Sequence, residues 1–192
     1  MQSQRYRDLR RRIAVLKRRL PQASPIGFYS PRQIDATLSF RLLSHAELEA
    51  CIEDLAATAL NSAYVAYQFN LKIDSVLLSL AAHYGGFKLS GGFGRDGTDR
   101  VLRDAVTSHS RVIRTNHGVR ERTLVKLLAP LGVKAGDLDP KWVADIDSFG
   151  SRRGATAHSS VGALAIPDPV QERKDVTALV DGLAGVDKLL LR

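Results

Sequence analysis

The ten residues from Ser151 to Ser160 combine side-chain types that suit chemistry on a phosphate ester. Arg153 precedes His158 by five residues, and small residues surround both of them. Arginine carries a permanent charge on a planar group that binds phosphate oxygens. Histidine has an unperturbed pKa of roughly 6.5, which suits proton transfer near neutral pH. The stretch is therefore a candidate site for a large anionic substrate, and the alternative is an ordinary polar helix face.

RNA is a substrate that fits these two side chains, because it supplies its own nucleophile, the 2′-hydroxyl. Cleavage then needs a base, a cation beside the phosphate and an acid for the leaving 5′-oxygen. A positioned histidine contributes roughly 10²–10⁴-fold to the rate of such a proton transfer. We expect no cofactor and no metal, because the histidines are not spaced along the sequence as metal ligands are. They are His45, His83, His109, His117 and His158.

The geometry of one helix leaves this site incomplete. Five residues turn an α-helix by about 500°, so Arg153 and His158 point some 140° apart. One chain also offers one such histidine, whereas the reaction needs both a base and an acid. A two-fold dimer with the 140–160 helix at its interface would bring two Arg153–His158 pairs into one cleft. We therefore expect a homodimer with a composite site.

The elements that must position this stretch are helices. No segment shows sustained strand alternation, and apolar residues recur at spacings of three and four along most of the chain. Proline after serine or aspartate marks three helix starts. The sequence predicts an all-α bundle of about five to seven helices, in the ranges 5–20, 31–69, 71–84, 98–115, 121–131, 140–160 and from 169 onwards.

Four polar residues stand four apart on the longest of these helices and therefore form one stripe. They are Arg41, His45, Glu49 and Glu53. We interpret them as possible supporting residues in the wall of an active cleft, and the alternative is a solvated or subunit-facing stripe. Arg152 is a further supporting candidate, because it precedes His158 by six residues, which satisfies a looser form of the same Arg-to-His spacing.

The net charge of +8 is concentrated at the N-terminus. Residues 1–20 hold eight basic side chains against Asp8 alone, so the remaining chain is close to neutral. Two interpretations stay open: an arm that tracks RNA phosphates, or a helix docked by its apolar stripe. The candidate RNA-binding residues are Arg5, Arg7, Arg10, Arg11, Arg12, Lys17, Arg18 and Arg19.

The composition favours a cytoplasmic location. The single cysteine, Cys51, excludes an intramolecular disulfide and suits a reducing compartment. No apolar run approaches the ~18–20 residues of a membrane helix, so no membrane association is expected. The basic N-terminus holds only the short apolar run Ile13–Leu16, which is too short for a secretory signal.

Three segments, in order, resemble one branch of the HEPN superfamily, the RiboL-PSP-HEPN branch. Arg41–Glu53 resembles its first core helix, and Asn116–Gly132 is similar to its middle segment. Arg153–His158 aligns with the family's Arg-Asn-x-x-Ala-His motif, with Ala157 just before the histidine. Gly154 departs from the motif, where the family usually has asparagine or another polar residue.

The resemblance implies a HEPN-like helical domain over residues 30–192, preceded at 1–29 by a basic helix or arm and a linker. It also implies a metal-independent endoribonuclease that dimerises and belongs to a toxin–antitoxin, phage-defence or stress system, with an antitoxin or another protein as partner. Catalysis would rest on Arg153 and His158. The alternative is a catalytically silent HEPN-like module that binds a protein or RNA, as Gly154 and the basic arm suggest.

Overall fold

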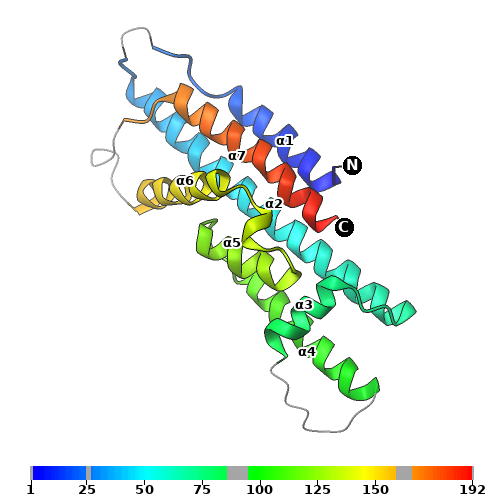
Figure 1. Cartoon of the computed structure of the whole chain (residues 1–192). Coiled ribbons are helices and arrows are strands. Elements are labelled where there is room, and N and C mark those ends of the chain that lie inside the picture. The colour runs from blue at the N-terminus through cyan, green and yellow to red at the C-terminus, as the bar shows by residue number, and fades with distance from the viewer. Residues whose placement is uncertain (1, 25–26, 86–94, 159–165, 192) are drawn as a thin grey trace.

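The protein is an all-α bundle, as the helical spacing of its apolar residues predicts. The computed structural model describes residues 2–24, 27–85, 95–158 and 166–191 (Figure 1). Seven α-helices and no strand lie within these ranges. The helices are α1 (Gln4–Lys17), α2 (Pro31–Asn70), α3 (Ser75–Tyr84), α4 (Arg95–Arg114), α5 (Glu121–Leu128), α6 (Pro140–His158) and α7 (Pro169–Leu190).

Helix α2 is the element against which the others pack. It runs unbroken for 40 residues, or about 60 Å at 1.5 Å per residue. Ser30 caps its first turn and Pro31 occupies the first helical position, as predicted from the sequence. No glycine or further proline interrupts it before Leu71, whose left-handed φ of 55° ends the helix. All six other helices contact α2.

The basic N-terminal helix belongs to the hydrophobic core of the bundle. Helices α1 and α7 lie side by side along the N-terminal part of α2 (Figure 1). The predicted apolar stripe of α1 is buried, and the hydroxyl of Tyr6 donates to the Val180 carbonyl of α7 at 3.0 Å. The structure therefore shows the second interpretation of the basic helix, in which its apolar stripe packs against the bundle. The domain division at residue 29 stays a prediction.

Helix α3 begins four residues later than the sequence analysis expects. Residues 71–74 are not helical, and the carboxylate of Asp74 accepts a hydrogen bond from the Leu77 amide at 3.0 Å. Asp74 is therefore the N-cap, a role that aspartate fills well because its oxygen satisfies a free amide. The apolar pattern continued across this cap and concealed it.

Helix α6 lies across α2 and α7 and carries the Ser151–His158 segment out from the core (Figure 1). Asp139 and Pro140 start the helix as predicted. Trp142, Ile146 and Phe149 form its buried face, and the Trp142 indole donates to the Leu179 carbonyl at 2.9 Å. These anchors fix where the following turns of α6 lie.

Two observations bear on chemistry elsewhere in the chain. The Cys51 side chain is completely buried, and burial raises its pKa to about 12, so it is not an available nucleophile. Among the described helices, none is long and apolar enough to cross a membrane.

A buried histidine joins α3, α4 and α5. The Nε2–H group of His109 donates to the Leu127 carbonyl at 3.1 Å, because a carbonyl oxygen can only accept. Its Nδ1 therefore accepts from the Tyr84 hydroxyl at 3.0 Å. Burial lowers the pKa of His109 to about 4, which the bond to Leu127 partly opposes. The ring is thus neutral in the folded protein at physiological pH.

This histidine should make the fold sensitive to mild acid. Between about pH 6.5 and 4 the unfolded chain binds a proton at His109 that the folded chain does not. The free energy of unfolding should therefore decrease as the pH is lowered through this window, by up to about 1.4 kcal/mol per pH unit. Urea unfolding at pH 7, 6 and 5 should show a smaller decrease for His109→Gln. Equal pH dependence in the two proteins would contradict this role.

Candidate active site

The polar stripe of α2 faces other helices and not solvent. Arg41 and His45 are buried, while Glu49 and Glu53 are half-buried. The four side chains point toward α6, α7 and the connector between α4 and α5, as their hydrogen bonds show. The structure thus brings together the four supporting residues predicted on α2, and each has a structural partner.

Arg41 fastens three helices with one guanidinium group. Its Nε and Nη2 donate to the two carboxylate oxygens of Glu172 on α7, at 3.1 and 2.6 Å. Its Nη1 donates to the hydroxyl of Thr156 on α6 at 2.9 Å. Because Glu172 neutralises this buried charge, Arg41 positions α6 and is not free to bind a substrate phosphate.

His45 is held neutral beneath α6. Its Nε2 accepts a hydrogen bond from the Val119 amide at 3.4 Å, so the ring proton lies on Nδ1. Nδ1 lies 3.6 Å from the Glu49 carboxylate, and the ring stacks on Phe149 of α6. Burial lowers the pKa of His45, Glu49 raises it in part, and the charge of Arg153 lowers it further. Arg153 therefore lies within electrostatic range of this ring.

The two glutamates of the stripe hold the connector that follows α4. The Gly118 amide donates to Glu49, and the Asn116 side chain donates to Glu53 at 2.7 Å. Gly118 has a φ of +84°, a left-handed conformation that favours glycine. Burial raises the pKa of Glu53, and the bond from Asn116 opposes that shift. The gap between the predicted helices 98–115 and 121–131 is confirmed, and it is a loop clamped to α2.

Gly150 lets α6 pack directly on this connector. A Cβ atom at Gly150 would lie 2.4 Å from the Val119 carbonyl oxygen, which is closer than real Cβ contacts. At Gly154, one turn further on, a Cβ would meet nothing within 4 Å. The first glycine is required by packing. The second occupies open space, so the polar residue usual in HEPN proteins would fit there.

The structure distinguishes the two adjacent arginines of α6. Arg152 donates to Asp175 of α7 at 2.5 Å and to Ser148 at 3.2 Å, and its guanidinium lies 5.7 Å from the centre of the Phe149 ring. Arg153 is half-buried and makes no hydrogen bond or ion pair with any residue that the structure describes. Arg152 therefore anchors α6 to α7, whereas the Arg153 guanidinium is available to an anion.

His158 is the last residue of α6. Its side chain and residues 159–165 lie outside the described residues, so the predicted pairing with Arg153 stays a prediction. In the described part of the chain, no group of three or more His, Cys, Asp or Glu side chains is placed to hold a metal ion.

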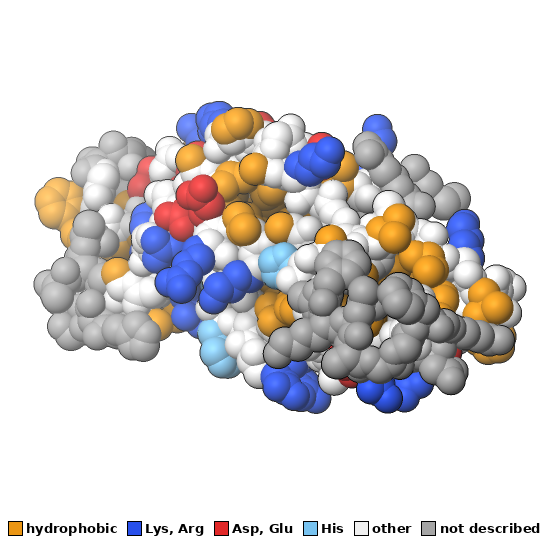
Figure 2. Space-filling model, turned by 60° about the horizontal axis from the view of Figure 1, so that its bottom comes forward, with side chains coloured by type: hydrophobic (Ala, Val, Ile, Leu, Met, Phe, Trp, Pro, Cys, Tyr) orange, Lys and Arg blue, Asp and Glu red, His pale blue; other side chains and the backbone are white. Residues whose placement is uncertain are grey.

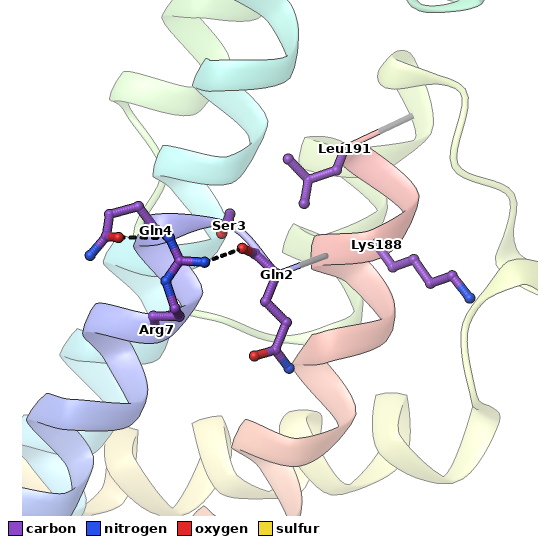
Figure 3. A pocket seen from close by; sticks show the side chains of 6 residues that line it. All are labelled: Gln2, Ser3, Gln4, Arg7, Lys188 and Leu191. Carbon is purple, nitrogen blue, oxygen red and sulfur yellow. Dashed lines mark hydrogen bonds between the residues drawn. The ribbon is translucent and has the colours of Figure 1, made fainter.

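The basic residues of α1 and of the two positions that follow it differ in their partners. Arg5 and Arg12 pair with Asp54 and Glu47 of α2 at 2.7 and 2.9 Å, Arg11 pairs with Asp8, and Lys17 donates to Thr177. Arg7 donates at 2.7 Å to Gln2 and to Gln4 beside a pocket where α1 begins and α7 ends (Figure 3). Exposed guanidinium groups without an ion pair to any described residue remain at Arg10, Arg18 and Arg19.

The sequence analysis missed the partners that hold this site, namely Thr156, Glu172 and Asp175. One signal could have revealed Glu172. It stands four residues before Val176 on the face of α7 that continues through Leu179 and Leu183, and all four are buried. A charge at a core position of an amphipathic helix indicates a buried partner.

No known family model, curated protein or solved structure matches this chain. The geometry of the site therefore carries the argument. One arginine of α6 pairs with no described residue, its charge acts on the neutral His45, and the polar stripe of α2 is already engaged with other helices and the connector.

Loss of the Glu172 charge should destabilise the fold much more than loss of the Asp175 charge, because the Arg41–Glu172 pair is buried. Glu172→Gln should lower the free energy of unfolding by about 3–5 kcal/mol, since it leaves the Arg41 charge buried and unpaired. Asp175→Asn, at a partly exposed pair, should cost about 1 kcal/mol or less. Urea unfolding measures both. If Glu172→Gln does not fold, the double variant Arg41→Met/Glu172→Met should, and similar losses for the two single variants would contradict the assignment.

The two glycines of α6 form a second matched pair. Gly150→Ala should destabilise the fold by about 1–3 kcal/mol, because the added methyl group meets the Val119 carbonyl. Gly154→Ala should stabilise it by up to about 1 kcal/mol through helix propensity. Thermal and urea unfolding should give opposite signs. Stabilisation by Gly150→Ala would show that the close contact at Gly150 is wrong, and destabilisation by Gly154→Ala would show that the space at Gly154 is not open.

Proposed function

We propose that this protein is a metal-independent endoribonuclease of the HEPN type, in which Arg153 and His158 act on a phosphodiester bond. The observation that carries the proposal is the contrast within α6. Arg152 is bound to Asp175, while Arg153 has no ionic partner among the described residues and is half-buried. A free, partly desolvated guanidinium group five residues before a histidine suits an anionic substrate.

The chemistry follows from the roles of these two residue types. One His158 removes the proton of the 2′-hydroxyl, and that oxygen forms a bond to the adjacent phosphorus. Arg153 binds the non-bridging oxygens while negative charge develops on them. The bond from phosphorus to the 5′-oxygen breaks, and a second histidine donates a proton to that oxygen. The products are a 2′,3′-cyclic phosphate and a 5′-hydroxyl end.

The second histidine is assigned to a second copy of the chain. His45 does not fit the role, because it is buried and its Nε2 already accepts from the Val119 amide. The exposed side of α6 carries only small residues at its centre, at Ala144, Ser148, Ser151 and Ala155. Nothing bulky there would keep two α6 helices apart, which supports a homodimer packed through this side. At 100° per residue His158 lies on this side of α6, whereas Arg153 lies on the side of Phe149.

A catalytically silent binding module is the second candidate. It is favoured by Gly154, which stands in open space where a polar side chain would fit. In that case a protein or RNA partner would use the same surface without being cleaved. A toxin–antitoxin, phage-defence or stress setting and a cytoplasmic location belong to either version of the proposal.

The first experiment measures RNA cleavage by the purified protein in EDTA, with the product ends identified. Wild type should leave 2′,3′-cyclic phosphate, and Arg153→Gln and His158→Ala should each lose about 10²-fold or more in rate. Arg152→Gln is the matched control, and it should keep cleavage while lowering stability, because its guanidinium serves α7. No cleavage of single-stranded or structured RNA by wild type would favour the silent module.

The dimer is tested with the same assay. Specific activity should rise with protein concentration in parallel with the dimer fraction from analytical ultracentrifugation. His117→Ala serves as a further control, because His117 is the exposed histidine on the clamped connector. Full activity of a monomer, or loss of activity in His117→Ala, would overturn the composite dimeric site.

A further inference from the structure

Helix α4 carries four arginines on one side. At 100° per residue, Arg100, Arg103, Arg111 and Arg114 fall within an arc of about 80°. All four are exposed. The buried residues of the same helix, including Leu102, Ala105, His109 and Ile113, lie on the opposite side. We call these four residues the α4 arginine row.

The arginine row has no partner within the described part of the chain. None of its guanidinium groups forms a hydrogen bond or an ion pair there, whereas four basic side chains of α1 are tied to α2, to α7 or to Asp8. Among the α4 side chains that the structure describes, the exposed acid nearest to the row is Asp104, at its edge. Four like charges over about 21 Å of helix repel one another, so an anionic partner would relieve that repulsion.

The row leads to the candidate site. Arg114 ends α4, and the next residues are clamped to α2 through Asn116 and Gly118. Beyond them the Val119 carbonyl lies against Gly150 of α6, one helical turn before Arg153. His117 is exposed between the row and that contact. Figure 2 shows Lys and Arg side chains along the lower edge of the visible face and a further group at its left, with a histidine between them.

The composition of this surface favours a nucleic-acid strand over a protein. The positions between the arginines on the exposed side hold Thr107 and Ser110, and no large apolar side chain occupies the middle of the row. Stable protein interfaces have an apolar centre that this surface lacks. A line of cations without such a centre is suited to a phosphate backbone, which presents charge at regular intervals.

We propose that the α4 arginine row binds the backbone of single-stranded RNA and directs the strand toward Arg153. This inference rests on the proposed function, since it names how the same site receives its substrate. It also relocates the RNA-binding surface. An RNA-binding arm was one of the two interpretations of residues 1–20, and there Arg10, Arg18 and Arg19 remain exposed without an ion pair to any described residue.

The test compares two sets of three arginines in a chain that cannot cut its ligand. Both triple variants are made in His158→Ala, and binding of a fluorescent single-stranded RNA of about 20 nucleotides is measured by anisotropy between 0.05 and 0.3 M NaCl. Replacing Arg103, Arg111 and Arg114 by Gln should lower affinity at least about tenfold at 0.15 M salt. The slope of log K against log salt should become shallower by about 2, since each single-strand contact contributes about 0.7.

The matched control removes the same number of charges from the N-terminal segment, one on α1 and two just after it. Replacing Arg10, Arg18 and Arg19 by Gln should leave affinity within about threefold and the salt slope nearly unchanged. A larger loss in the α1 variant, an equal loss in both variants, or no RNA binding by the His158→Ala parent would each overturn the inference. Because the readout is binding, a row-dependent affinity in a protein whose wild type cuts no RNA would refute the ribonuclease proposal and leave the row intact.

Discussion

The buried ion pair between Arg41 and Glu172 is the contact on which the arrangement of the candidate site depends. It joins α2 to α7, and the third donor of Arg41 reaches Thr156 of α6. Two charges removed from water require each other, because either one alone would remain buried and unpaired. The pair therefore fixes the relative position of three helices. It adds little net stability compared with an apolar contact of the same shape.

From this pair the remaining contacts follow in order along α2. His45, one turn later, supports α6 through Phe149 and the connector through Val119. Glu49 and Glu53, on the next two turns, fasten the connector itself. A single polar stripe thus fastens α7, α6 and the connector to α2. The stripe resembles catalytic machinery in its residue types, but its hydrogen bonds are used for positioning.

The adjacent residues Arg152 and Arg153 illustrate how a helix separates structural from functional charge. Neighbouring positions differ by about 100° in direction, so one side chain reaches α7 and the other does not. Asp175 and Ser148 hold Arg152. Arg153 keeps a guanidinium group that pairs with no described residue and whose charge lowers the pKa of His45. The same division recurs on a larger scale, since two cations of α1 pair with carboxylates of α2, whereas the arginine row on α4 pairs with no described residue.

The sequence by itself determined the elements. Apolar spacing, Ser30-Pro31, Asp139-Pro140 and Asp168-Pro169 are local signals, and they predicted the helices and most of their ends. They failed at Asp74, where the apolar pattern ran past the cap. Local signals also identified the stripe at Arg41–Glu53, because residues four apart share a face in any helix.

Only the tertiary structure decided what these residues do. Whether Arg41 binds a substrate or Glu172 depends on a residue 131 positions away in the chain, and no local pattern specifies that pairing. The same holds for the choice between Arg152 and Arg153, which Asp175 makes, and for the requirement at Gly150, which arises from the Val119 carbonyl. Spacing along a helix fixes the direction in which a side chain points. Which residue it meets there depends on how the helices pack.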